Sequence, residues 1–143
     1  MAVRQQGPHT YMRGEPLVLE GSFQSNDTAA PTIFRDGHAL ITSVTRVSVG
    51  LYEVTFDSQT MVPELPVTMA AWVNSIGTTV KCCDAFAIDS TWDKTNKKFR
   101  IEILTNGSVG GGAVAPSRAD PDNGARVGFR IVGSVNSAGT DVA

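Results

Sequence analysis

Short runs of alternating apolar and polar residues recur along most of this 143-residue chain. Successive side chains of a β-strand point to opposite faces, so a period of two is typical of a strand with one buried face. Turn-forming residues separate seven such runs, which we expect to be strands: 17–23, 40–47, 51–56, 67–73, 79–88, 99–103 and 127–131. The pattern predicts an all-β fold, either an antiparallel β-sandwich or a jelly-roll or barrel-like domain.

The alternation also predicts which side chains meet in the core. Each run has one apolar face, and the expected core residues are Leu17, Leu19, Phe23, Tyr52, Val54, Phe56, Val67, Met69, Ala71, Val73, Val80, Cys82, Phe86, Ile88, Phe99, Ile101, Ile103, Val127, Phe129 and Ile131. Asp84 interrupts the apolar face of 79–88, and a polar group there needs a partner or marks a sheet edge. A short helix is the alternative for residues 67–73.

Two tight connections can be placed between these runs. Val49-Gly50 predicts a hairpin between residues 40–47 and 51–56. Residues 93–98 (Asp-Lys-Thr-Asn-Lys-Lys) predict an exposed hairpin turn that joins a strand ending near Trp92 to one starting at Phe99.

The length of the chain suits a single domain with one core. Residues 1–16 contain few core candidates, so we expect an extended N-terminal arm ahead of a β domain over 17–135. Residues 136–143 are expected to form a flexible C-terminal tail. Residues 105–125 form a loop longer than compact domains ordinarily use, and loops of this kind are either unstructured or used for contact.

Composition argues against several classes of partner. The formal net charge is -2 with both signs interspersed, so attraction to nucleic acid or to an anionic membrane is not expected. No apolar run reaches the ~20 residues that span a membrane, and the chain does not begin with a secretory signal, which predicts a soluble, cytoplasmically made chain. Cys82 and Cys83 are adjacent, so we expect one buried and one semi-exposed thiol, with an intermolecular disulfide as the alternative.

The sequence offers little for catalysis. Its two histidines, His9 and His38, lie in the arm and in a turn, and no base with a positioned partner can be assembled around them, so we do not expect an enzyme. Two adjacent cysteines and two distant histidines do not match zinc spacing. Residues 120–124 (Asp-Pro-Asp-Asn-Gly) could form a calcium loop, but they lack EF-hand spacing and are first of all turn formers. No metal or cofactor is therefore predicted.

Aromatic side chains offer a second kind of site. Trp72, Trp92 and Tyr52 could together form a sugar-binding surface, although large aromatics more often belong to the core. Trp92 lies beside the predicted turn and is the best candidate for an exposed, ligand-facing aromatic side chain.

Residues 44–56 (Val-Thr-Arg-Val-Ser-Val-Gly-Leu-Tyr-Glu-Val-Thr-Phe) resemble a hairpin, V-T-R-x-G-x-G-x-Y-x-V-T-F, that recurs in small β domains of tailed-phage virion proteins. Gly21-Ser-Phe-Gln, Ala30-Pro-Thr, Phe99-Arg-Ile-Glu-Ile and residues 127–133 are similar to other parts of those domains, in the same order. Where that pattern usually has Thr-Gly before the hairpin glycine, this chain has Ser48-Val49, which leaves the turn type open.

The resemblance implies a virion structural protein that is made in the host cytoplasm and placed on the capsid surface. The size of the chain favours a head decoration (cement) or head-fibre type, which would bind the major capsid protein and associate as a homotrimer. The arm would then contact the capsid, with Arg4, Tyr11, Met12 and Arg13 as anchors. Loop 107–124 is a second candidate surface. The alternative is a tail-fibre, receptor-binding or carbohydrate-binding module.

Overall fold

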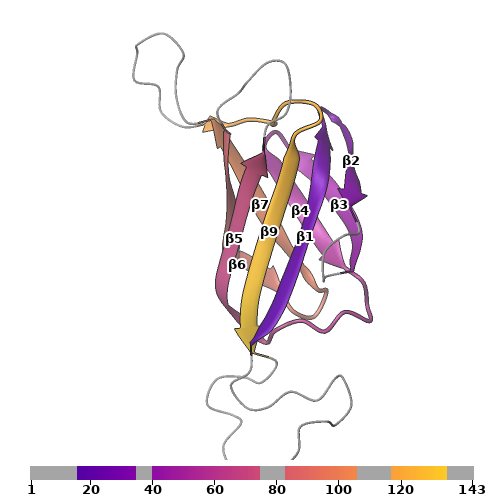
Figure 1. The fold of residues 1–143 in the computed structure, drawn as a ribbon, viewed down its shortest axis with the longest axis vertical. Coiled ribbons are helices and arrows are strands. Elements are labelled where there is room, and N and C mark those ends of the chain that lie inside the picture. The colour runs from indigo at the N-terminus through magenta and orange to yellow at the C-terminus, as the bar shows by residue number, and fades with distance from the viewer. Residues whose placement is uncertain (1–15, 35–39, 75–82, 106–116, 135–143) are drawn as a thin grey trace, which may run out of the picture.

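The computed structural model describes residues 16–34, 40–74, 83–105 and 117–134, which form two antiparallel β-sheets (Figure 1). The strands are β1 (Leu17–Asn26), β2 (Ala29–Phe34), β3 (Ile41–Ser48), β4 (Leu51–Phe56), β5 (Leu65–Asn74), β6 (Cys83–Asp93), β7 (Lys98–Thr105), β8 (Ser117–Arg118) and β9 (Arg126–Ser134). Among the described residues no helix is long and apolar enough to cross a membrane.

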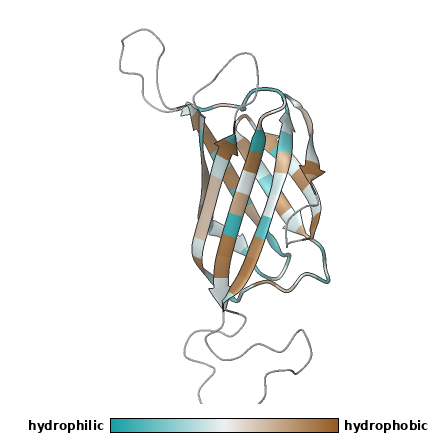
Figure 2. Cartoon of the chain, viewed as in Figure 1, coloured by the Kyte–Doolittle hydropathy of each residue, from teal (hydrophilic) through white to brown (hydrophobic). Residues whose placement is uncertain are grey.

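The two sheets pack face to face, as the alternation predicts for a β-sandwich. Sheet A has the strand order β2-β1-β9-β5, and sheet B has the order β3-β4-β7-β6 with the short β8 paired to β7. β5 lies beside β6 and β2 beside β3, so the sheets also approach one another at both edges. Figure 2 shows the alternation along β1 and β9, where hydrophobic and hydrophilic segments follow one another.

The core fills the space between the sheets with the apolar faces of their central strands. Its buried members include Leu19, Phe23, Ile41, Val44, Tyr52, Val54, Phe56, Phe99, Ile101, Ile103, Val127, Phe129 and Ile131. Phe99 stacks on Phe56 at 5.9 Å between ring centroids and meets Phe129 of the opposite sheet edge-on at 5.2 Å. These contacts bring 99–103 and 127–131 into one core, which confirms that prediction.

Both predicted tight connections are present. Ser48 and Leu51 are paired across Val49-Gly50, and Gly50 has φ of 66°. A type I′ turn needs positive φ at both central residues, and in this turn only Gly50 has it. Asp93 and Lys98 are paired across the second turn, where the Asp93 carboxylate accepts hydrogen bonds from the backbone N–H groups of Thr95 and Asn96.

Residue Val67 departs from the expected core face, since it is 82% exposed. Pro66 is paired with Gly133 and Thr68 with Val132, so Val67 is the extra residue of a β-bulge. A bulge shifts the alternation by one residue. The strand itself, rather than the alternative helix, is confirmed for 67–73, and Met69 lies against the core as expected.

The predicted core face of β6 is wrong. Cross-strand partners share a face, and β6 pairs Ala85 with the buried Ile103 but Phe86 with Glu102. Small alanines therefore face the core, whereas Phe86 points outward and is 50% exposed. Asp84 is exposed on the last strand of its sheet and is not without a partner, which agrees with both alternatives expected for a polar group there.

Strand β2 was not predicted, because its sequence, Ala-Ala-Pro-Thr-Ile-Phe, has no apolar alternation and contains Pro31. Proline cannot donate to a sheet, and β2 is an edge strand, where this is tolerated. The expected arm 1–16 except for Pro16, the core candidates Val80 and Cys82, both histidines and the expected tail 136–143 lie outside the described residues.

Candidate functional site

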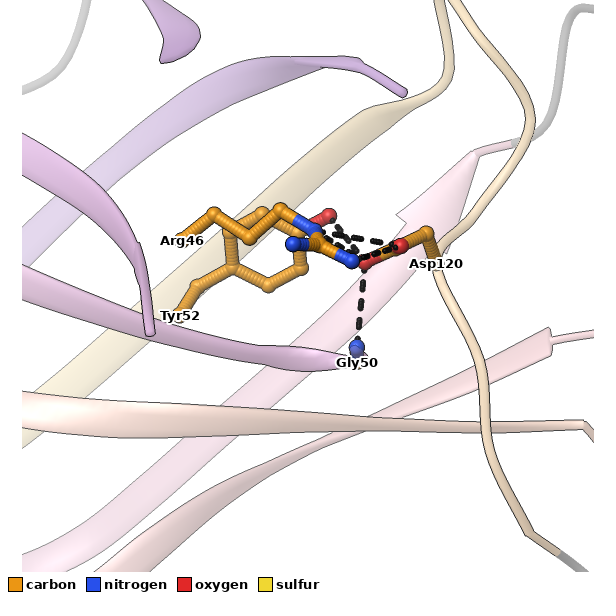
Figure 3. Close-up of polar contacts among 4 residues, drawn as sticks. All are labelled: Arg46, Gly50, Tyr52 and Asp120. Carbon is orange, nitrogen blue, oxygen red and sulfur yellow. Dashed lines mark hydrogen bonds and ion pairs between the residues drawn. The ribbon is translucent and has the colours of Figure 1, made fainter. Parts of the chain in front are cut away.

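The carboxylate of Asp120 accepts hydrogen bonds from three residues of the β3–β4 hairpin (Figure 3). Arg46 donates from Nε to both oxygens of Asp120, at 3.0 and 3.1 Å, and from Nη2 to Oδ2 at 2.7 Å. The backbone N–H of Gly50 and the hydroxyl of Tyr52 each donate to Oδ1 at 3.0 Å. We call these four residues the Asp120 cluster.

The chain places Asp120 there by means of backbone pairing. β8 pairs with β7, and the next residue, Ala119, donates its N–H to the carbonyl of Ile103. The carbonyl of Gly50 accepts from Ile103 N, so hairpin, β7 and the segment after β8 meet at one point. A Cβ on residue 50 would lie 2.7 Å from both Ala119 N and Ile103 O. Only glycine fits this position, which its positive φ also favours.

Charge and burial set the protonation of the cluster. Burial opposes ionisation of Asp120, but the hydrogen bonds from Arg46, Gly50 and Tyr52 outweigh it and lower the pKa of the carboxyl below its usual value. Burial, reinforced by the hydrogen bond to Asp120, raises the pKa of Tyr52 to about 12. Asp120 is therefore ionised and Tyr52 neutral at physiological pH.

The Asp120 cluster holds the segment after β8 against the β3–β4 hairpin, and it is poorly suited to catalysis. A general base needs a pKa near the working pH and free access to a proton, and Asp120 has neither. The guanidinium of Arg46 already covers both carboxylate oxygens, so a calcium ion bound there would meet a positive charge. Within the described part of the chain, no three or more histidine, cysteine, aspartate or glutamate side chains gather as metal ligands would. Asp120 is thus a structural anchor of the loop.

Ion pairs lie on the outer face of sheet B. The outer face of sheet B carries ion pairs of Glu53 with Lys98 and Arg100, and of Glu102 with Arg118. A surface laced with exposed pairs of both signs is well solvated, and each pair contributes little to stability.

Several of the exposed large apolar side chains belong to β5 and β6, two strands that lie beside one another. Leu65 and Val67 of β5 are 68% and 82% exposed, and Phe86 of β6 is 50% exposed. A groove of about 410 Å³ runs between the two strands, and Val67 lines it together with Ala87 and Asp89. We call Leu65, Val67 and Phe86 the β5–β6 surface. Both strands are the last of their sheets, and an exposed apolar edge is a place where another chain can bind.

The predicted aromatic surface does not form from the residues named for it. Tyr52 is fully buried, and Trp92 packs against Phe56 and Phe99 at 6.5 and 6.3 Å between ring centroids. The Nε1 of Trp92 is buried and has no hydrogen-bond partner among the described residues. Trp92 is therefore partly buried against the core. The exposed tryptophan is Trp72, at 43%.

The remaining predicted contacts are only partly described. Arg4, Tyr11, Met12 and Arg13 lie outside the described residues, as do residues 106–116 of the long loop. The end of that loop supplies Asp120, whose partnership with Arg46 spans 74 residues and leaves no local signal in the sequence.

Comparison of the chain with models of protein families, with curated proteins and with solved structures finds no match.

Proposed function

We propose that this chain is a structural protein of a tailed-phage virion, a capsid decoration protein that associates as a homotrimer and binds the major capsid protein. The observation that carries the proposal is the resemblance of residues 44–56 to the hairpin of small virion domains. In the fold these residues are the β3–β4 hairpin. Arg46, Gly50 and Tyr52, which match that pattern, all bind Asp120. The pattern thus has a physical reason here, since its residues hold Asp120 and the segment after β8 against the hairpin.

The exposed chemistry of the described residues supports an assembling protein. The β5–β6 surface presents three large apolar side chains at adjoining sheet edges. Burial of such side chains against a second chain contributes roughly 25 cal/mol for each Å² removed from water. Weak contacts of this kind become strong when many are made at once on a capsid, because each bound copy raises the effective concentration of the next contact.

The arm completes the proposal. Residues 1–15 precede β1, whose first residue, Leu17, lies at one end of sheet A (Figure 1). An extended segment can reach a neighbouring subunit and gain order there, which adds contact area without enlarging the domain. Arg4, Tyr11, Met12 and Arg13 remain the proposed anchors to the capsid.

Sedimentation with undecorated heads of the parent phage tests this proposal. We expect the full chain to sediment with the heads and a chain lacking residues 1–15 to remain in the supernatant. Alanine at Arg4, Tyr11, Met12 and Arg13 together should have the same effect as the truncation. A chain lacking residues 136–143 is the matched control and should still bind. Failure of the full chain to sediment, or equal binding of the arm-deleted chain, would refute the capsid role.

A further inference from the structure

The indole of Trp72 lies across the neighbouring strand, on the outer face of sheet A. Trp72 and Gly128 are cross-strand partners. A Cβ on residue 128 would lie 2.5–2.6 Å from Cε2, Cζ2 and Nε1 of the indole, so a side chain at 128 would displace the ring. Gly128 lets the indole rest on the backbone of β9, while the residue stays 43% exposed. The indole therefore packs on the backbone of β9 while part of Trp72 stays in contact with solvent.

Sheet register fixes the surroundings of this indole. Residues two apart along a strand share a face, so the outer-facing neighbours of Trp72 form rows across β5, β9 and β1. One row runs Trp72, Gly128, Ser22 and Phe34, the next runs Asn74, Arg126, Gln24 and Thr32, and the row on the other side runs Ala70, Arg130 and Glu20. Gly128 lies beneath the indole, and Ser22 follows it in the same row on β1.

Polar side chains occupy the rows on both sides of Trp72. Arg130 pairs with Glu20 at 3.2 Å, which fixes a guanidinium and a carboxylate on one side. On the other side, the guanidinium of Arg126 lies 4.0 Å from the ring centroid of Phe34. The exposed Asn74 adds an amide next to it. A partly exposed indole therefore has hydrogen-bonding side chains in the two rows beside it.

We propose that this Trp72 surface (Trp72, Gly128, Asn74, Arg126 and Arg130) binds carbohydrate, with one pyranose ring on the open face of the indole. The C–H bonds on one face of a pyranose are apolar and pack on an aromatic ring, whereas its hydroxyl groups radiate outward near the plane of the ring. Asn74, Arg126 and Arg130 lie in the rows on either side of Trp72, and long side chains at such diagonal positions can reach a group bound on the indole. An apolar surface with a few placed polar groups is the usual composition of a small-molecule site.

A saccharide fits these observations better than a second protein chain or a nucleic acid. The row next to Trp72 carries the Arg130–Glu20 ion pair, and glutamate is depleted at protein interfaces, although arginine and tryptophan are enriched there. Nucleic acid requires a basic surface, and the chain has a net charge of -2. The inference is independent of the proposed capsid role, since the Trp72 surface and the β5–β6 surface involve different side chains.

Binding of β-linked hexasaccharides of glucose, N-acetylglucosamine and galactose to the full chain tests this inference by calorimetry, with the monosaccharides as a second arm. We expect the wild-type chain to bind at least one hexasaccharide more tightly than its monosaccharide, and Trp72→Ala to weaken that binding at least about tenfold, roughly the loss of one stacking contact. Gly128→Ala should weaken it as well, because the added methyl group displaces an indole that is still present. Trp92→Phe, which changes the buried tryptophan, is the matched control and should bind as the wild type does.

Light scattering on the same samples separates the two proposals. Trp72→Ala is expected to keep the wild-type mass, so loss of sugar binding at unchanged mass supports a carbohydrate site. If no saccharide of the panel binds the wild-type chain, or if Trp72→Ala binds as tightly as wild type, the inference is overturned. A mass that falls in Trp72→Ala would overturn it in favour of a protein contact at this face, and would leave the capsid role standing.

Discussion

The guanidinium of Arg46 and the carboxylate of Asp120, 74 residues apart in sequence, form a bidentate ion pair. The side chain of Arg46 is 20% exposed and that of Asp120 is 11% exposed. Removing one partner of such a pair leaves the other charge poorly solvated. We therefore expect Asp120→Asn, which keeps the shape of the side chain, to lower the free energy of unfolding by about 2–4 kcal/mol. Urea denaturation at a fixed protein concentration measures this loss.

An exposed pair provides the matched control. Glu102 and Arg118 form an ion pair at 2.9 Å whose side chains are more exposed than those of Arg46 and Asp120. Glu102→Gln should change the free energy of unfolding by no more than about 0.5–1 kcal/mol, since water replaces the lost contact. Equal effects of Asp120→Asn and Glu102→Gln would contradict the anchoring role of the Asp120 cluster.

Two glycines with positive φ, Gly50 and Gly124, allow the energetic cost of backbone strain to be measured apart from the cost of close packing. Gly50 has φ of 66° and no room for a Cβ, whereas Gly124 has φ of 90° and nothing within 4 Å of a Cβ built there. Gly124→Ala should cost about 1–2 kcal/mol, from the left-handed backbone alone. Gly50→Ala should cost about 2–5 kcal/mol, because the methyl group also meets the backbone of Ala119 and Ile103. Thermal unfolding of both variants gives the comparison, and a smaller loss at residue 50 would refute it.

The pKa of Asp120 makes stability depend on acid pH. Its folded-state pKa is lowered, so the unfolded chain binds the proton more readily. The contribution of Asp120 is therefore fully present above about pH 4 and is lost as the pH falls through the folded-state pKa. Asp93, whose pKa is also lowered by its hydrogen bonds within the turn, acts in the same direction. Asp120→Asn should reduce, without abolishing, the fall in stability below pH 4. An unchanged acid profile would be inconsistent with this cluster.

Tyr52 makes the stability of the fold depend on alkaline pH, in the opposite direction to Asp120. Its pKa is raised to about 12, so the folded chain holds the phenolic proton more firmly than the unfolded chain does. The resulting stabilisation is fully present below about pH 10 and is lost as the pH rises towards 12. Tyr52→Phe should be less stable than the wild type at neutral pH by about 1 kcal/mol. Between about pH 10 and pH 12 it should lose less stability than the wild type does. Denaturation midpoints across this pH range, compared with the wild type, provide the measurement.

Strands with one buried face can be predicted from the sequence, because apolar side chains on the buried face alternate with polar side chains on the other. Leu17, Leu19 and Phe23 of β1 are all buried, as their spacing predicts. β2 and β6 were harder, because edge strands bury little. On β6 the core-facing residues are alanines, while the more hydrophobic Phe86 faces outward. Size and hydrophobicity therefore pointed to the wrong face.

The candidate sites depended on contacts that sequence spacing does not encode. Arg46 and Asp120 meet only because β8 pairs with β7 and carries the loop over the hairpin. Trp72 was recognised as an aromatic candidate, but its exposure depends on Gly128, 56 positions further along the chain. A glycine inside a strand that otherwise alternates is the signal that such a close approach leaves in the sequence.

Self-association is the central claim of the proposed function, and the mass of the purified chain in solution measures it directly. Light scattering should give about 45 kDa, three times the chain mass of 15.1 kDa. Val67→Asp, which places a charge in the β5–β6 surface, should reduce the mass towards one chain. Val47→Asp changes an exposed valine on β3, the strand at the opposite edge of sheet B, and should leave the mass unchanged. A mass of one chain for the wild type at every concentration would contradict the account.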